Sequence, residues 1–228
     1  MATASLTATS FSGYLLKQGV ITGGDPSIDW TNVVNATTAD TVYTWLSTGA
    51  VMADGSTSLR IDRLYLVFNT SSIPPSATIT SISLKLYVSS ILGLKDFKIY
   101  KTSSPTLSTT LQASDYNVTN FSTDYGDGYT FTPSSTGAYT VTLSPSGSLA
   151  TDVKNLNELS IVFRNYFDYT DFIPAGTYNS ASFRLSLSPS PYISVTYTTG
   201  YGNKIDSIIN IGSVNNVSIS SISKVSVV

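Results

Sequence analysis

The chain contains no histidine and no cysteine, and only 11% of its 228 residues are charged. Without these side chains there is no Ser-His-Asp triad, no thiolate nucleophile, no disulfide and no conventional zinc, haem or iron–sulfur site. The formal net charge of −2 and the scattered positions of Lys and Arg argue against nucleic-acid binding, which needs a basic surface. The composition therefore favours a structural or binding protein over an enzyme.

The sequence also has little that resembles a targeting segment or a membrane anchor. Its first ten residues, MATASLTATS, lack the basic start and the apolar stretch of a signal peptide. The longest uninterrupted apolar run in the first 200 residues, Leu64 to Phe68, is far shorter than the roughly 20 residues that cross a bilayer. We therefore expect a soluble protein that contacts no membrane and does not enter the secretory route by itself.

What is present is a period-two pattern of β-branched and aromatic residues between turns rich in Pro, Gly, Asn and Asp. Residues 61–68 predict a strand buried on both faces, and residues 79–88 predict a strand with one apolar face. Further strands are predicted at 97–101, 138–143, 159–164, 183–187 and 192–197, with one short helix at 148–155. We expect an antiparallel two-sheet sandwich. Its predicted core includes Leu64, Leu66, Phe68, Ile82, Leu84, Leu86, Ile161, Phe163 and Val195.

Residues 69–88, NTSSIPPSATITSISLKLYV, resemble the strand–turn–strand signature of jelly-roll modules of the DNRLRE and disaggregatase-related kind, which are similar to carbohydrate-binding modules. Phe68 to Ser71 match the end of the first strand, with Asn69 in place of the usual Asp. Ile73-Pro74 matches the turn, and residues 77–81 and 84–87 match the second strand. Residues 29–41, 156–161 and 191–197 resemble the opening and the late strands of the version found in bacteriophage structural proteins.

The resemblance implies an all-β fold, an antiparallel two-sheet jelly-roll sandwich with an extended C-terminal tail. We divide the chain into an N-terminal arm (1–10), the jelly roll (11–198) and a C-terminal assembly tail (199–228). The resemblance also implies a non-enzymatic virion structural protein, such as a capsid decoration, head-fibre or tail component, made in the host cytoplasm. Its partners would be identical subunits, other virion proteins and a host-surface glycan.

After residue 200 the apolar residues recur mostly every third position, a period that fits neither helix nor strand. Short runs in this tail resemble degenerate Lys-Val-Asn-Gly-Val repeats at the ends of some phage proteins. An isolated segment cannot bury such a stripe, so we expect it to order against identical chains, with a homotrimer as the preferred state; a passive tail is the alternative. The stripe comprises Ile205, Ile208, Ile211, Val214, Val217, Ile219, Ile222 and Val225.

The densest candidate contact site combines aromatic rings, which stack on sugars or partners, with polar groups that bind hydroxyls. Its residues are Arg164, Asn165, Tyr166, Phe167, Asp168, Tyr169, Asp171, Phe172 and Tyr178. The alternative is that this segment packs over the end of the sandwich or against a neighbouring subunit. A second cluster, Tyr116, Phe121, Tyr125 and Tyr129, has the same two interpretations.

The acidic residues indicate calcium binding or catalysis less clearly than the aromatic clusters indicate a contact site. Asp124 and Asp127 carry the hard oxygen ligands that Ca²⁺ prefers, although Asp in a Gly-rich loop also makes turns. No other cofactor is expected. Thirteen Asp and the single Glu158 do not single out the pair of carboxylates that a glycosidase needs. A carbohydrate-binding module without catalytic activity is the main alternative to the virion protein, and a polysaccharide-degrading enzyme is the third interpretation.

Overall fold

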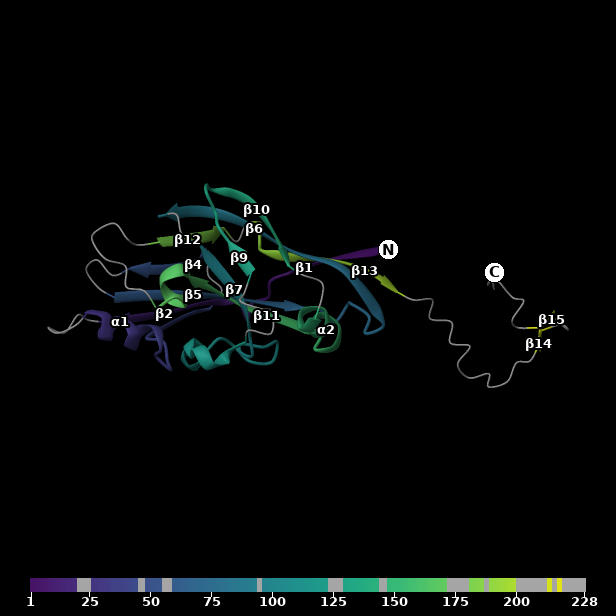
Figure 1. The fold of residues 1–228 in the computed structure, drawn as a ribbon, viewed down its shortest axis with the longest axis horizontal. Coiled ribbons are helices and arrows are strands. Elements are labelled where there is room, and N and C mark those ends of the chain that lie inside the picture. Colours follow the sequence, from purple (N-terminus) through teal and green to yellow (C-terminus); the bar gives the residue numbers. More distant parts are fainter. Residues whose placement is uncertain are drawn as a thin grey trace.

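The structure is a computed structural model. It describes residues 1–19, 26–44, 48–54, 59–93, 96–122, 129–143, 147–171, 181–186, 189–199, 213–214 and 217–218. Within these ranges two antiparallel β-sheets pack against each other, which confirms the expected all-β sandwich (Figure 1). Tail positions Ile205, Ile208, Ile211, Ile219, Ile222 and Val225 lie outside the described residues, and Val214 pairs with Val217 in a short hairpin of β14 (Ser213–Val214) and β15 (Val217–Ser218).

The strand order is that of a jelly roll. The first sheet runs β1-β13-β6-β10 and the second β5-β11-β7-β9, so strands distant in the sequence lie side by side. The bounds are β1 Ala2–Thr7, β13 Tyr192–Thr199, β6 Ala77–Leu92 and β10 Gly137–Leu143 in the first sheet, and β5 Leu59–Asn69, β11 Glu158–Asn165, β7 Phe97–Thr102 and β9 Tyr129–Phe131 in the second.

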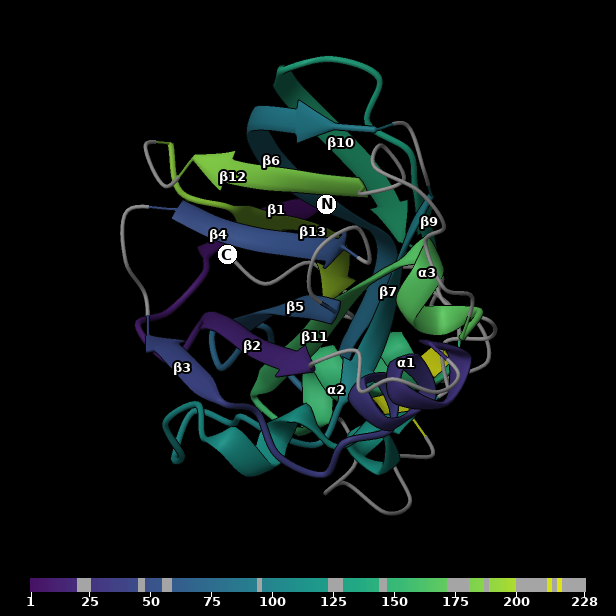
Figure 2. The ribbon, with the colours of Figure 1, turned by 90° about the vertical axis from the view of Figure 1, so that its left-hand side faces the viewer.

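Additional strands widen the second sheet and connect the two sheets at one side. β2 (Gly13–Gly19) pairs with β5 and carries β3 (Thr41–Thr44) on its other edge, and β8 (Phe121–Ser122) pairs with β7. β12 (Ala181–Ser186) pairs with β6 and with β4 (Thr48–Asp54), which in turn pairs with β5. Figure 2 shows β12 and β4 between β6 and β5, where they join the sheets.

The main hydrophobic core fills the space between the two sheets. It includes all nine residues that the sequence assigned to the core, each at most 4% exposed. The predicted helix is confirmed as α2 (Gly147–Asn155), which adds Leu149 and Val153 to this core at one end of the sandwich.

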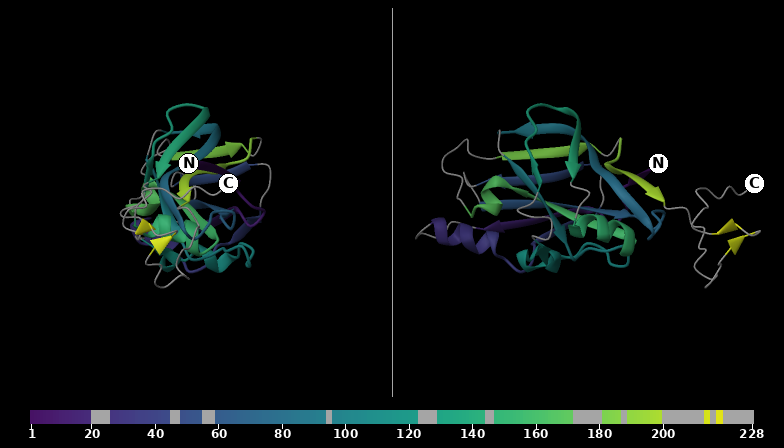
Figure 3. Two further views of the ribbon diagram at one scale, coloured as in Figure 1. Left: turned by 90° about the vertical axis from the view of Figure 1, so that its right-hand side faces the viewer. Right: turned by 45° about the vertical axis from the view of Figure 1, so that its right-hand side comes forward.

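A second core covers the outer face of the second sheet and explains why β5 is buried on both faces. Tyr65 of β5 and Val162 of β11 pack there against α1 (Pro26–Val34), which contributes Trp30, and against α3 (Tyr166–Tyr169). The 3-10 turns η1 (Ala113–Tyr116) and η2 (Val118–Asn120) complete this layer (Figure 3). Helix α1 was not among the predicted elements, although its proline at the first position and Asp29 in the first turn are helix-start signals.

The jelly roll begins earlier than the boundary predicted at residue 11. All six residues of β1 pair in register with β13, and Thr9 donates its amide hydrogen to the carbonyl oxygen of Val67 at 2.8 Å. Residues 1–10 are therefore part of the sandwich and not a separate arm. Ala4, Leu6 and Ala8 give only a weak apolar alternation, so the sequence pattern does not predict this strand.

Candidate functional site

The predicted contact segment after β11 does not form an open loop. Strand β11 continues to Asn165, whose Oδ1 accepts the amide hydrogen of Phe167 at 2.9 Å and so caps the short helix α3. This helical turn directs Asp168 back toward the second sheet. Asn165 and Asp168 are 0% exposed and Phe167 is 3% exposed.

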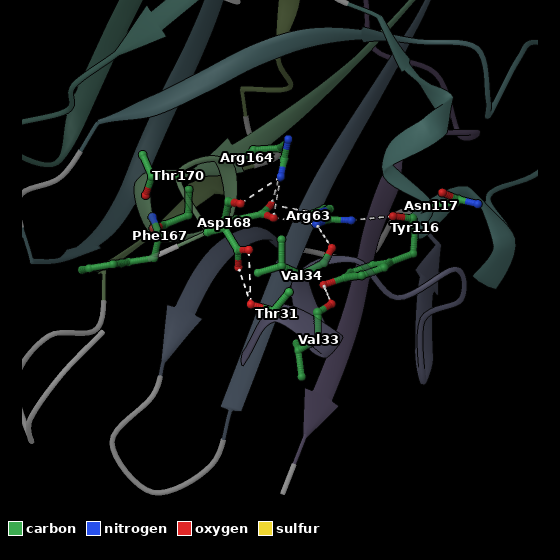
Figure 4. A network of polar contacts seen from close by, with 12 residues as sticks. Thr31, Val33, Val34, Arg63, Tyr116, Asn117, Arg164, Phe167, Asp168 and Thr170 are labelled. Carbon is green, nitrogen blue, oxygen red and sulfur yellow. Dashed lines mark hydrogen bonds and ion pairs between the residues drawn. The ribbon is translucent and has the colours of Figure 1, made fainter. Parts of the chain in front are cut away.

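Asp168 is held by two arginines from neighbouring strands (Figure 4). Arg63 of β5, which is 0% exposed, donates from Nε to Oδ2 of Asp168 at 2.8 Å. Arg164 of β11 donates from Nη2 to Oδ1 of Asp168 at 3.0 Å. Arg63 also donates to the carbonyl oxygens of Val34 at 2.8 Å and of Tyr116, and its guanidinium lies 4.0 Å from the centre of the Tyr116 ring. One buried side chain thus connects α1, η1 and α3.

The electrostatics of this cluster are those of a satisfied ion-pair network. Burial alone would raise the pKa of Asp168, but the charges of Arg164 and Arg63 and their hydrogen bonds outweigh burial and lower it to about 2. Burial likewise raises the pKa of Tyr116, whose hydroxyl donates to the carbonyl oxygen of Val33 at 3.2 Å. Both carboxylate oxygens of Asp168 accept hydrogen bonds from arginines, so this carboxylate is satisfied within the protein and the cluster joins separate elements.

The remaining residues of the predicted contact segment have different environments. The ring centres of Tyr166 and Tyr169 lie 5.7 Å apart at a steep angle, and both side chains are half-buried. Exposed Asp171 accepts a hydrogen bond from the hydroxyl of Thr31 at 3.2 Å. Phe172 and Tyr178 lie outside the described residues. The buried members Asn165, Phe167 and Asp168 therefore cannot touch a glycan in this structure. They pack inward, as the alternative expected, but against the outer face of the second sheet and not over the end of the sandwich.

The second aromatic cluster also packs inward where it is described. Tyr116 is 0% exposed, and Phe121 lies 6.4 Å from Tyr65 between ring centres. Tyr129 is partly buried against the main core, and Tyr125 lies outside the described residues.

Two further features to consider are metal-binding groups and membrane-spanning helices. The described ranges hold no group of three or more acidic side chains that could bind a metal ion, and the calcium candidates Asp124 and Asp127 fall outside those ranges. None of the helices in the described part of the chain has the length and apolarity needed to cross a bilayer.

A shallow groove lies on the outer face of the first sheet. Its volume is about 300 Å³, and Lys85 and Tyr87 of β6, Tyr139 and Thr140 of β10 and Tyr192 of β13 line it. Tyr87 is 39% exposed, and Lys85 donates to the Thr140 hydroxyl at 2.7 Å. The sequence places Lys85 and Tyr87 on the face of β6 opposite the apolar residues. It does not predict the groove, because only the strand pairing shows that β10 and β13 lie beside β6.

Strand β1 is an uncharged edge of the first sheet. Within the described part of the chain it pairs only with β13, and its sequence ATASLT contains neither charge nor proline. At the opposite edge, β10 pairs only with β6 among the described strands, and its sequence GAYTVTL is also free of charge and proline. Natural sheets usually protect such edges with Lys, Pro or a bulge.

Comparison with known proteins gives no identification. No protein-family model matches the chain, and no curated protein matches it either. The fold therefore defines the class, a jelly-roll β-sandwich.

Proposed function

We propose that this chain is a non-enzymatic structural protein of a bacteriophage particle, such as a capsid decoration, head-fibre or tail component, that acts through assembly with identical subunits. The observation that best supports assembly is the unprotected edge of β1. The resemblance of residues 29–41, 156–161 and 191–197 to the jelly roll of bacteriophage structural proteins supports the particle assignment.

The hydrogen-bonding groups of β1 indicate how a second copy would bind. Ala8 donates its amide hydrogen to the carbonyl oxygen of Pro191 at 2.9 Å, in the same register that pairs Leu6 with Ile193. In an antiparallel ladder, every second residue directs its amide and carbonyl to the same side. The amides of Ala4 and Leu6 therefore face β13, whereas those of Thr3 and Ser5 face the open edge. After Thr7 this edge meets β5, because Ala8 forms a bridge with Phe68 and Thr9 donates to Val67.

The two open edges are complementary in direction. β1, β13, β6 and β10 alternate in direction, so β10 of one copy followed by β1 of the next continues the antiparallel alternation. Such head-to-tail pairing closes into a ring when the rotation between copies permits it. A ring of three would be the homotrimer that the period of the tail favours.

The test of assembly is the variant Ser5→Pro, which removes one edge-facing amide without touching the ladder to β13. Sedimentation velocity of the full chain should show oligomers for the wild type and for the matched control Ser5→Ala, and mainly monomers for Ser5→Pro. Unchanged oligomers in Ser5→Pro would exclude pairing through β1. Mass spectrometry of purified particles tests the assignment to a virion, which the absence of this chain from them would contradict.

The groove on the first sheet favours a second candidate function, a carbohydrate-binding module without catalysis. Tyr87 offers a ring for stacking, and Lys85 and Tyr192 offer polar groups for hydroxyls. A glycan array probed with the full chain should then give signals that Tyr87→Ala abolishes. Within the virion proposal, the same surface would contact a host glycan.

A further inference from the structure

A separate hollow lies at the end of the sandwich where β7 leaves β11. The ladder between these strands ends at the pair Lys101 and Ile161, so residues 158–160 of β11 are left to line one side. The hollow has a volume of about 270 Å³. Its walls come from β7 and the residue after it, α2 and the residue after it, and the start of β11: Lys101, Thr102, Ser103, Asp152, Leu156, Glu158, Leu159 and Ser160.

The hydroxyl of Ser160 is the first observation that points to a ligand. Ser160 is 7% exposed, and its Oγ finds no hydrogen-bond partner among the residues that the structure describes. Buried hydroxyls nearly always have a partner, and leaving one unsatisfied costs about 1–3 kcal/mol. Because Ser160 lines the hollow, a rotation about its Cα–Cβ bond can direct Oγ to a molecule bound there.

The other polar groups of the hollow are held in place. Lys101 Nζ lies 2.7 Å from Asp152 Oδ2, and the side chains are only 23% and 11% exposed. Glu158 Oε2 accepts the amide hydrogen of Leu107 at 2.8 Å, which fixes the carboxylate. Opposite charges, a hydroxyl and a carboxylate thus surround one small space, next to the apolar surface of Leu156, which is 53% exposed.

This lining selects a class of ligand by its charge and size. Two carboxylates and one ammonium give a net negative lining, which disfavours phosphate, sulfate and uronic acids. The ammonium of Lys101 disfavours a metal cation. The volume is below the range typical of drug-sized ligands, about 300–1,000 Å³. A neutral molecule with several hydroxyls can donate to Glu158, accept from Lys101, pair with Ser160 and place its C–H groups against Leu156.

We propose that the hollow between α2 and the start of β11 binds a small neutral polyol of the size of a single sugar ring. The site lies apart from the β1 edge and from the Tyr87 groove. The inference therefore goes beyond the proposed assembly function and does not rest on it.

The experiment is a titration of the full chain with sugars, in which NMR measures the ¹H and ¹⁵N chemical shifts of the backbone amides. The probes are glucose, galactose, mannose and N-acetylglucosamine with their methyl glycosides, and glucuronate, phosphate and Ca²⁺ for comparison. We expect at least one neutral sugar to shift the amides of Ser103, Leu156 and Ser160 saturably, and glucuronate, phosphate and Ca²⁺ to do so more weakly. Binding of the glycosides would identify the end of a glycan as the source, whereas binding of free sugars alone would identify a soluble sugar.

Two variants separate a ligand role from a structural one. Without sugar, Ser160→Ala should melt at or above the wild-type temperature, because it removes an unsatisfied hydroxyl. Sugar should raise the melting temperature of the wild type but not that of this variant. Glu158→Gln should bind at least tenfold more weakly. The matched control, Ser194→Ala on the outer face of β13, should bind as the wild type does.

Several outcomes would overturn the proposal. These are no saturable shift with any neutral sugar, stronger binding of phosphate or Ca²⁺ at these amides, or unchanged binding in both variants. Ser5→Pro should keep the sugar response, so failure of the assembly test and failure of this one remain distinguishable.

Discussion

At the scale of single residues, the charge of Asp168 has the clearest consequence. Its folded-state pKa of about 2 lies below the ordinary value of 3.8, so the ionised form stabilises the fold. This stabilisation is complete above pH 4 and is lost as the pH falls through the folded-state value. We expect unfolding in urea to show a loss of about 2 kcal/mol between pH 4 and pH 2 from this group.

The control for this pH dependence is Asp168→Asn. Without the carboxylate, two arginines lose their counter-charge, so the variant should be less stable at pH 7 by roughly 3–5 kcal/mol. Asp62 acts in the opposite direction, because burial raises its pKa despite its ion pair with Arg60. The difference between wild type and variant, which cancels Asp62, should shrink from pH 4 to pH 2. A difference that stays constant over this range would contradict the role given to Asp168.

Phe68 tests the main core at the same scale. Its side chain is 0% exposed between the sheets, so Phe68→Ala should lower the free energy of unfolding by about 3–5 kcal/mol. Tyr87→Ala on the outer face is the matched control and should change stability by about 0.5 kcal/mol or less. Equal effects of the two substitutions in chemical denaturation would mean that Phe68 is not a core residue.

At the scale of elements, β1 has two sides with different tasks. Ala4→Pro removes an amide that faces β13, whereas Ser5→Pro removes one that faces the open edge. Both substitutions replace a small side chain, so the difference between their melting temperatures reports mainly the loss of the backbone amide. Ala4→Pro should destabilise the sandwich by at least about 1 kcal/mol more than Ser5→Pro, because it breaks a ladder hydrogen bond. The reverse order would show that the assignment of the two sides is wrong.

Helices α1 and α3 and the turn η1 are connected by one buried side chain. Arg63 donates to the carbonyl oxygens of Val34 in α1 and Tyr116 in η1 and to Asp168 in α3. A buried arginine in a strand whose residues are mostly apolar indicates a buried partner. The sequence signals that such a partner exists, but only the packing of α3 against β11 identifies it as Asp168.

At the scale of the whole molecule, the remaining prediction concerns the tail. Deleting residues 203–228 should leave the melting transition of the sandwich in place, since the strands of both sheets end by Thr199. The same deletion should abolish oligomers or incorporation into particles if the apolar stripe is an assembly element. Light scattering of the truncated chain measures this directly. Oligomers identical to those of the full chain would make the tail a passive end and leave the β1 edge as the assembly surface.

The sequence by itself determined the fold class, most of the strands after residue 60, the helix α2 and the inter-sheet core. These follow from local periodicity, because a strand with alternating apolar residues such as Ile82, Leu84 and Leu86 must bury one face. Strand β1 and helix α1 escaped prediction because ATASLT and PSIDWTNVV have weak patterns. β1 gains stability by pairing with β13, and α1 by packing against β2 and β5.

Only the tertiary structure decided which polar and aromatic residues remain available. Asn165, Phe167 and Asp168 have the composition of a binding segment, yet α3 turns them into the protein, where arginines from two strands satisfy the carboxylate. Conversely, Ser160 carries no sequence signal, and its hydroxyl becomes significant because β7 leaves β11 beside it. The physical reason is that periodicity reports which face of an element is buried, whereas hydrogen-bond partners are set by strands and helices far apart in the chain.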